Sequence, residues 1–203
     1  KFIPQADLAV LDPILTTAYV TRHHGYMIWD TLYGFDQDYK PQPQMVQGHV
    51  VENGGLLWRF TLREGLRFHD GTPVRGRDCI ASIRRWGRRD AFGQELMARV
   101  AEMTEESDRV FAIRLNRPFP KMIEAFSKVT TSCLCIKPER LGNVDPFTNI
   151  TEAVGSGPFR FKADERVPGS LNVYTKFERY APRADAPRGW TSGAKVVHFD
   201  RVE

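Results

Sequence analysis

The sequence predicts a mixed α/β fold, and three observations lead to this prediction. Apolar and polar residues alternate over residues 57–62 and again over 110–115, as they do in half-buried strands. Apolar residues recur at helical spacing between Gly76 and Arg89. The chain has 203 residues, 41% hydrophobic and 27% charged, an ordinary globular composition that is long enough for one large or two small domains.

The first forty residues predict three elements. The apolar run Leu8–Leu11, which Asp12-Pro13 ends, is typical of a buried strand. The polar segment 19–24 predicts a loop after that strand. Apolar residues within Tyr26–Tyr33 then predict a helix that packs against the strand.

Residues 57–74 predict a β-hairpin followed by a turn. The alternation over 57–62 stops at Glu64-Gly65, which can form the hairpin connection, and it resumes over 66–68. Asp70-Gly71 is typical of a tight turn, so the second strand is expected to end there.

A helix is predicted from about Gly76 to Arg89, with Cys79, Ile83 and Trp86 as its apolar stripe. No Ser, Thr or Asn precedes it as a cap, so we expect a weaker first turn, by up to about 1 kcal/mol. Asp78 lies in that turn and favours the positive end of the helix dipole.

The remaining chain predicts several short elements. A short helix is expected to open at Pro118-Phe119-Pro120, since proline is tolerated in the first turn. The other expected elements are strands over 110–115 and 129–136, a hairpin of 159–161 with 171–175, and a closing strand over 196–202.

Two segments of this chain resemble a known family. Residues 58–73 resemble the run Trp-x-Phe-x-Leu-Arg-x-Gly-x-x-Phe-His-Asp-Gly-Thr-Pro of the extracellular solute-binding proteins of peptide and nickel importers, called family 5. Residues 154–159 resemble the family's Val-Gly-Thr-Gly-Pro-Tyr segment, with Ser156 and Phe159 as the two departures.

The resemblance implies a periplasmic-binding-protein-like lobe, in which a sheet domain is split around a smaller inserted α/β domain. The first domain is expected to comprise residues 1–34 and 154–203, and the inserted domain residues 35–153. Family members are more than twice this length, so the chain is expected to be the front part of such a protein, with the second large lobe absent.

The implied function is the substrate-binding component of an ABC importer that captures a peptide or similar small solute. Nickel complexes, opines, sugars and glutathione are alternative ligands. The expected partners are this ligand and a membrane-embedded ABC permease, without nucleic acid and without direct membrane insertion. The expected location is periplasmic, or extracellular and tethered to the membrane.

The resemblance also implies where the ligand binds. In the family, the segment after the first strand lines the ligand cleft. Carried over to this chain, it makes Tyr19, Thr21, Arg22 and His23 the candidate ligand contacts. The alternative is a surface loop without a ligand role.

Other kinds of site are less well supported by the sequence. A hydrolase could use His69-Asp70 or Ser156, but Asp70 precedes a turn glycine and Ser156 lacks the strand–turn–helix setting of an esterase nucleophile. The adjacent His23 and His24 rarely bind one metal together. No cofactor, metal or catalytic residue is expected. The net charge of +4 is not concentrated enough to predict nucleic-acid binding.

The chain contains three cysteines, and an odd number argues against a disulfide framework. Cys133 and Cys135 lie in a strand-like apolar run, where their side chains would share one face. A bridge across two residues of an extended strand would be strained. The sequence therefore predicts buried free thiols.

Overall fold

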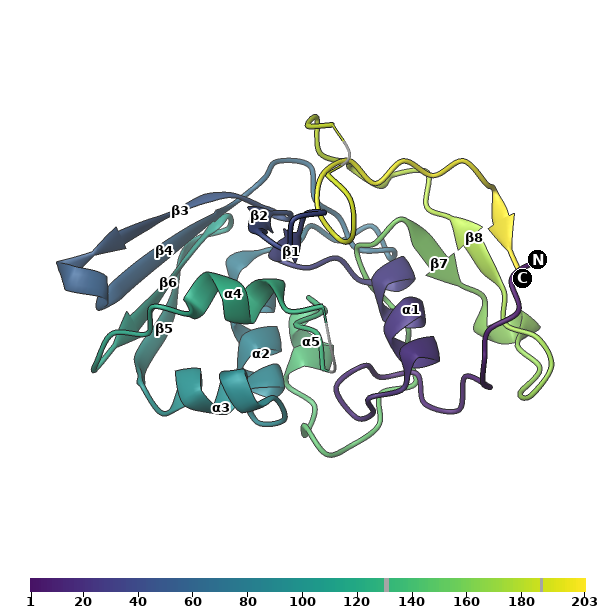
Figure 1. Ribbon diagram of the computed structural model, residues 1–203, viewed down its shortest axis with the longest axis horizontal. Helices are drawn as coiled ribbons and strands as arrows, with labels where there is room; N and C mark the ends of the chain where they lie inside the picture. The colour runs from purple at the N-terminus through teal and green to yellow at the C-terminus, as the bar shows by residue number, and fades with distance from the viewer. Residues whose placement is uncertain (130–131, 187) are drawn as a thin grey trace.

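The structure is a computed structural model that describes residues 1–129, 132–186 and 188–203. A four-stranded antiparallel sheet in the order β3-β4-β6-β5 forms one end of the molecule, on the left in Figure 1. Phe60 pairs with Phe111 across its two central strands, so the buried residues of both strands meet on one face. The strands are β3 (Val46–Glu52), β4 (Leu57–Leu62), β5 (Val100–Ser107) and β6 (Val110–Leu115).

Helices cover this face of the sheet, and α2 contacts both β5 and β6 (Figure 1). The predicted helix from Gly76 is confirmed as α2. Its first turn is supported by Asp78, whose carboxylate accepts the Arg75 N–H at 2.7 Å. The short helix after Pro120 is also confirmed. The helices are α2 (Gly76–Gly87), α3 (Ala91–Met97), α4 (Met122–Ser127) and α5 (Glu139–Gly142).

The predicted hairpin of residues 57–68 is wrong. Strand β4 pairs with β3 on one side and β6 on the other, and residues 66–68 do not pair with it. The chain instead closes a small loop, in which the Val74 N–H donates to the Leu66 carbonyl at 3.1 Å. Leu66 and Phe68 are buried as expected. The alternation of side chains predicted the buried face correctly. It cannot predict which strands form hydrogen bonds with β4.

The N-terminal region also differs from the prediction. Leu8–Leu11 is buried in part but forms no strand, and the expected loop is the start of helix α1 (Tyr19–Ile28). Val20, His24 and Ile28 are buried at a spacing of four residues. Because the polar residue His24 lies within this buried stripe, the apolar residues alone do not show the helical spacing. The chain then becomes extended at Trp29, so the helix predicted over Tyr26–Tyr33 is misplaced.

A three-stranded antiparallel sheet, β7-β8-β9, forms the opposite end of the molecule (Figure 1). The predicted pairing after residue 159 is confirmed with a shifted second strand, because Phe159 pairs with Lys176. The closing strand predicted over 196–202 is shorter in the structure, where only residues 201–202 form it. The strands are β7 (Phe159–Phe161), β8 (Tyr174–Lys176) and β9 (Arg201–Val202).

Smaller elements connect these parts. Of the predicted strand 129–136, Thr130 and Thr131 lie outside the described residues, and in 132–136 only Cys135 forms a bridge, with Thr31. A two-stranded ribbon and two 3₁₀ turns complete the list: β1 (Tyr33–Phe35), β2 (Pro41–Pro43), η1 (Asn53–Gly55) and η2 (Ala163–Glu165).

Among the described residues, buried apolar side chains form one large cluster and two small ones. The large cluster lies under the four-stranded sheet. Its members come from the stretch of sequence from Leu32 to Ile136, together with Ile14. The small clusters lie around α1 and the three-stranded sheet. Cys133 and Cys135 belong to a small cluster, although the sequence placed them in the inserted domain. The predicted division at residues 34 and 154 stays a prediction.

Candidate functional site

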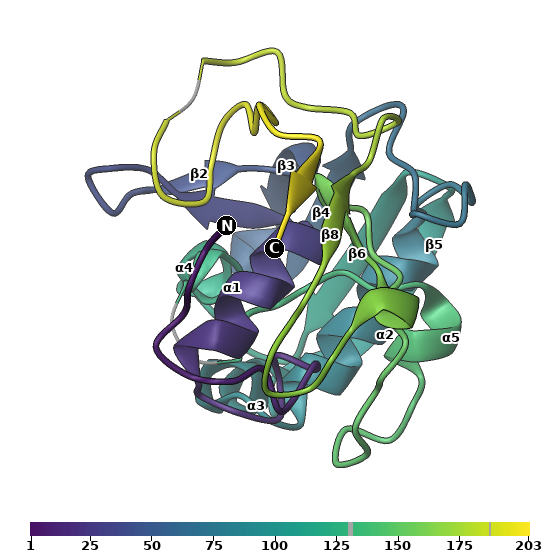
Figure 2. The ribbon, with the colours of Figure 1, turned by 90° about the vertical axis from the view of Figure 1, so that its right-hand side faces the viewer.

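Helix α1 carries all four predicted ligand contacts and lies between the two sheets (Figure 1). Figure 2 shows that both chain termini lie beside it, next to β9. Because successive residues of a helix point about 100° apart, the four side chains cannot share one face. The structure therefore separates them into three environments.

The exposed Tyr19 and the half-buried Arg22 form a pair at the N-terminal end of α1. The Tyr19 side chain is 57% exposed, and the Arg22 guanidinium lies 4.3 Å from the centre of its ring. Arg22 Nη1 also donates to the Val129 carbonyl at 3.1 Å. One contact orients the guanidinium, while its remaining N–H groups can bind a carboxylate or an amide oxygen.

A polar cavity of about 290 Å³ is lined by Lys128, which precedes the Val129 whose carbonyl Arg22 contacts. Asp90 is almost fully buried there, caps α3 through the Phe92 N–H at 3.0 Å, and forms an ion pair with Lys128. Hydroxyl, guanidinium and ammonium groups thus surround this cavity. Its polar lining residues are Thr16, Thr17, Arg89, Asp90, Lys128 and Ser132.

Thr21 points into the protein. It is 1% exposed, and its hydroxyl donates to the Val10 carbonyl at 2.7 Å. This contact attaches α1 to the chain before it. The side chain is a structural contact in this structure rather than part of a surface.

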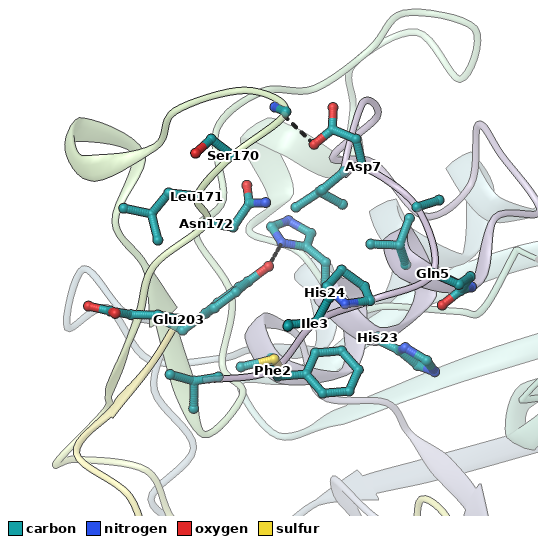
Figure 3. Close-up of a pocket in the computed structure, with 18 residues that line it drawn as sticks. Phe2, Ile3, Gln5, Asp7, His23, His24, Ser170, Leu171, Asn172 and Glu203 are labelled. Atoms are coloured by element: carbon teal, nitrogen blue, oxygen red, sulfur yellow. Dashed lines mark hydrogen bonds between the residues drawn. The ribbon is translucent and has the colours of Figure 1, made fainter.

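His23 lies on a different face of α1 from Arg22, at a larger cavity of about 400 Å³ (Figure 3). Its ring meets the edge of Phe2 at 6.5 Å between ring centres. Burial and the neighbouring Arg22 charge lower the pKa of His23. The N-terminal segment 2–8, residues 169–172 and the end of β9 form the other walls.

The larger cavity is mainly apolar, and some of its polar groups bond within the protein, whereas His24 Nε2 and Asn172 Oδ1 are buried without a partner among the described residues. His24 Nδ1 lies 2.8 Å from the Tyr174 hydroxyl, and Asp7 accepts the Gly169 N–H at 3.1 Å (Figure 3). Burial lowers the pKa of His24 to about 3, so its imidazole is neutral. A charged solute finds better partners at Tyr19, Arg22 and the polar cavity than here.

The residues considered for hydrolysis have structural roles. His69 Nε2 donates to the Gly157 carbonyl at 3.1 Å, and His69 Nδ1 accepts the Gly155 N–H at 3.3 Å. Asp70 accepts the N–H and hydroxyl of Thr72, as expected for a turn. Within residues 1–129, 132–186 and 188–203, the buried Ser156 hydroxyl has no hydrogen-bond partner, so no activated nucleophile is formed.

Two features are absent from the part of the chain that the structure describes. No cluster of three or more histidine, cysteine, aspartate or glutamate residues there could hold a metal ion. In that same part, no helix has both the length and the apolar character required to cross a bilayer.

Comparisons with known proteins agree with one another. The model of the bacterial extracellular solute-binding proteins, family 5, matches residues 40–203. A probable peptide ABC transporter periplasmic-binding protein of Sinorhizobium fredii is 39% identical over 97% of this chain and 36% of its own length. A glutathione-binding protein of Salmonella typhi is 23% identical over 77% of this chain and 30% of its own length.

Solved structures show the same fold. An ABC transporter substrate-binding protein from Sinorhizobium meliloti superposes with a TM-score of 0.72 at 20% identity, over 97% of this chain and 37% of that one. The Agrobacterium protein AgaA, in complex with agropinic acid, gives 0.71 at 24% identity, over 85% of this chain and 34% of that one. The chain spans about a third of the length of the curated relatives it matches.

Proposed function

The chain belongs to the bacterial extracellular solute-binding proteins of family 5, and we propose that it forms part of the substrate-binding component of an ABC importer for peptides. The observation that carries this proposal is the 39% identity to a probable peptide-binding relative over nearly the whole chain. The partners would be a peptide and a membrane-embedded permease. The location would be the periplasm, or the outer surface of the cell.

The binding wall that we propose comprises Tyr19, Arg22 and the neighbouring polar cavity. The Arg22 guanidinium can bind a peptide carboxylate through two parallel hydrogen bonds, and the exposed Tyr19 ring can stack on the ligand or donate to it. Arg89 and Lys128 line this cavity, where Lys128 is paired with Asp90. Thr21 is not included because it is buried, and His23 is not included because it faces the apolar cavity.

We also propose that residues 1–34 and 154–203 form one lobe around the inserted domain 35–153. A second lobe closing over α1 would bury the ligand between two walls. The separate apolar clusters around α1 and under the four-stranded sheet support two cores, although Ile14 and Leu32 pack in the large cluster and Cys133 and Cys135 in the small one. The same arrangement would hold no cofactor and carry out no reaction.

The test uses a full-length binding protein that contains this segment. Calorimetry with a pool of unmodified di- to pentapeptides identifies a tight ligand, which is then compared with its C-terminal amide. Arg22→Ala and Tyr19→Ala should each weaken binding of the free acid about tenfold or more, which corresponds to about 1.4 kcal/mol. Arg22→Ala should also reduce the difference between the free acid and the amide.

His23→Ala is the matched control because it changes an exposed residue of the same helix that lines the apolar cavity. It should retain the affinity of the parent protein. Parent-like affinity in both Tyr19→Ala and Arg22→Ala would show that this wall is not the site. Failure of every peptide in the pool to bind, with binding of glutathione or agropinic acid instead, would overturn the peptide assignment. The same two variants would then test the wall with that ligand.

A further inference from the structure

Two cysteines are in contact beneath helix α1. Cys133 and Cys135 are 1% and 3% exposed, and their Sγ atoms lie 2.8 Å apart. Both thiols are free and belong to the apolar cluster that contains Ile28 and Trp29. The third cysteine, Cys79, is on α2 and lies in the large cluster under the four-stranded sheet. Cys133 and Cys135 are therefore partners for each other, while Cys79 belongs to a different core.

The backbone at these cysteines is bent rather than extended. The Cys135 N–H donates to the Cys133 carbonyl at 2.9 Å, which closes a three-residue turn. In an extended strand the Cα atoms of residues two apart are separated by about 6.6 Å, near the upper limit that a disulfide bridges. The turn shortens this separation. The strain expected for an extended strand therefore does not apply to the observed conformation.

We propose that Cys133 and Cys135 are a modification site, oxidised to an intramolecular disulfide by a small-molecule or protein disulfide. One cysteine sulfur attacks the oxidant's S–S bond, which gives a mixed disulfide and releases one thiol. The second cysteine sulfur then displaces the remaining oxidant sulfur and closes the new bond. Two electrons and two protons pass from the cysteines to the oxidant, whose disulfide becomes two thiols.

Burial determines when this reaction occurs. The contact with Cys133 and removal from water raise the pKa of the Cys135 thiol, which disfavours the reactive thiolate in the folded protein. Oxidation should therefore accompany folding, before the two sulfurs are covered. An oxidising compartment outside the cytoplasm would supply the disulfide, and this part of the inference rests on the proposed location.

The disulfide would stabilise a turn that joins the two parts of the molecule. Cys135 forms a bridge with Thr31, and the next N–H, of Ile136, donates to the Asp30 carbonyl at 3.0 Å. Thr31 follows the end of α1 by three residues. A covalent link at the turn would therefore restrict the segment 30–31 that follows α1, the helix that carries Tyr19 and Arg22.

Alkylation and mass spectrometry test the proposal on the chain as given. The protein is refolded from the reduced, denatured state in buffers of reduced glutathione and glutathione disulfide, quenched with iodoacetamide in denaturant, and digested with trypsin. Both cysteines lie in the peptide 129–140. That peptide should be unalkylated and lighter by two hydrogen atoms, while Cys79 should be alkylated.

Cys79→Ser should leave this result unchanged, and Cys135→Ser should make Cys133 reactive towards iodoacetamide. The quench is performed in denaturant, so the readout reports bonding and not accessibility. Full alkylation of all three cysteines in wild type at every glutathione ratio would overturn the proposal. A disulfide between Cys79 and either Cys133 or Cys135, in place of the Cys133–Cys135 bond, would overturn the proposal as well. Either result would leave the proposed peptide-binding function unaffected.

Discussion

His69 joins the two segments by which the sequence resembles its family. One ring nitrogen accepts the Gly155 N–H and the other donates to the Gly157 carbonyl, while the ring edge meets Phe177 at 4.9 Å between ring centres. Only the neutral imidazole can accept and donate at the same time. The neutral side chain therefore links its own segment by hydrogen bonds to Gly155 and Gly157, which lie 86 and 88 positions further along the chain.

This role predicts a loss of stability in acid. Burial lowers the pKa of His69 from 6.5 to about 4, so between these values the unfolded chain binds more protons than the folded chain. Stability is complete above pH 6.5 and falls as the pH falls towards 4. The free energy of unfolding, measured in urea, should be about 2 kcal/mol lower at pH 5 than at pH 7 through His69 alone.

The variant His69→Gln identifies this contribution. At pH 7 it should be less stable than wild type, because one side chain amide cannot reproduce both hydrogen bonds across the ring. At pH 5 the difference should become smaller, since wild type has then lost part of its advantage. A difference that is equal at both pH values would contradict the assignment. His24, with a pKa lowered to about 3, should add a similar acid dependence.

Among the elements, the turn before β7 is constrained by its closeness to the end of α1. A Cβ added at Gly155 would lie 2.1 Å from the Ile28 carbonyl oxygen and 2.6 Å from Trp29 Cδ1. The Gly157 N–H also donates to that carbonyl at 2.7 Å. The glycines of this turn are therefore required by backbone contact, not by flexibility.

Gly155→Ala should accordingly reduce the free energy of unfolding by about 3 kcal/mol or more, because backbone atoms cannot yield as a flexible side chain can. Gly48→Ala is the matched control: no atom lies within 4 Å of a Cβ built there, in strand β3. The control should change stability by less than about 0.5 kcal/mol. Equal urea midpoints for the two variants would show that the turn can move away from α1.

At the scale of the whole molecule, three buried charges connect the chain before α1 to the body under the four-stranded sheet. Asp12 is fully buried and lies 2.7 Å from Arg85 and 3.6 Å from Lys137. The Lys137 ammonium also lies 3.4 Å from the centre of the Trp29 ring. Burial lowers the pKa of Lys137, and the Asp12 carboxylate opposes that shift. The cluster thus fixes the position of α1 relative to α2.

Asp12→Ala should destabilise the protein by about 3–5 kcal/mol, because it leaves two buried cations without their counter-ion. Lys121→Ala is a suitable comparison, since it breaks an exposed pair with Glu124 and should cost less than about 1 kcal/mol. Urea unfolding followed by tryptophan fluorescence measures both. A cost for Asp12→Ala no larger than for Lys121→Ala would show that the buried cluster is dispensable.

The sequence by itself determined the mixed α/β class, the family, helix α2 and the buried faces of β4 and β6. These features are local, because side-chain periodicity and a long motif can be read without knowing what lies opposite. The short helix α4 followed from its prolines in the same way. The region around residues 19–28 was misjudged because the buried His24 interrupts an otherwise apolar helical stripe.

Only the tertiary structure decided which strands pair with β4, because hydrogen-bond partners lie far away in the sequence. It also buried Thr21 and placed His23 at the apolar cavity, while Tyr19 and Arg22 contact each other. The polar cavity was not predicted, because Thr16, Asp90 and Lys128 come together only when three distant segments fold against one another. The Cys133–Cys135 turn likewise depends on burial beneath α1, which no pattern in residues 129–136 indicates.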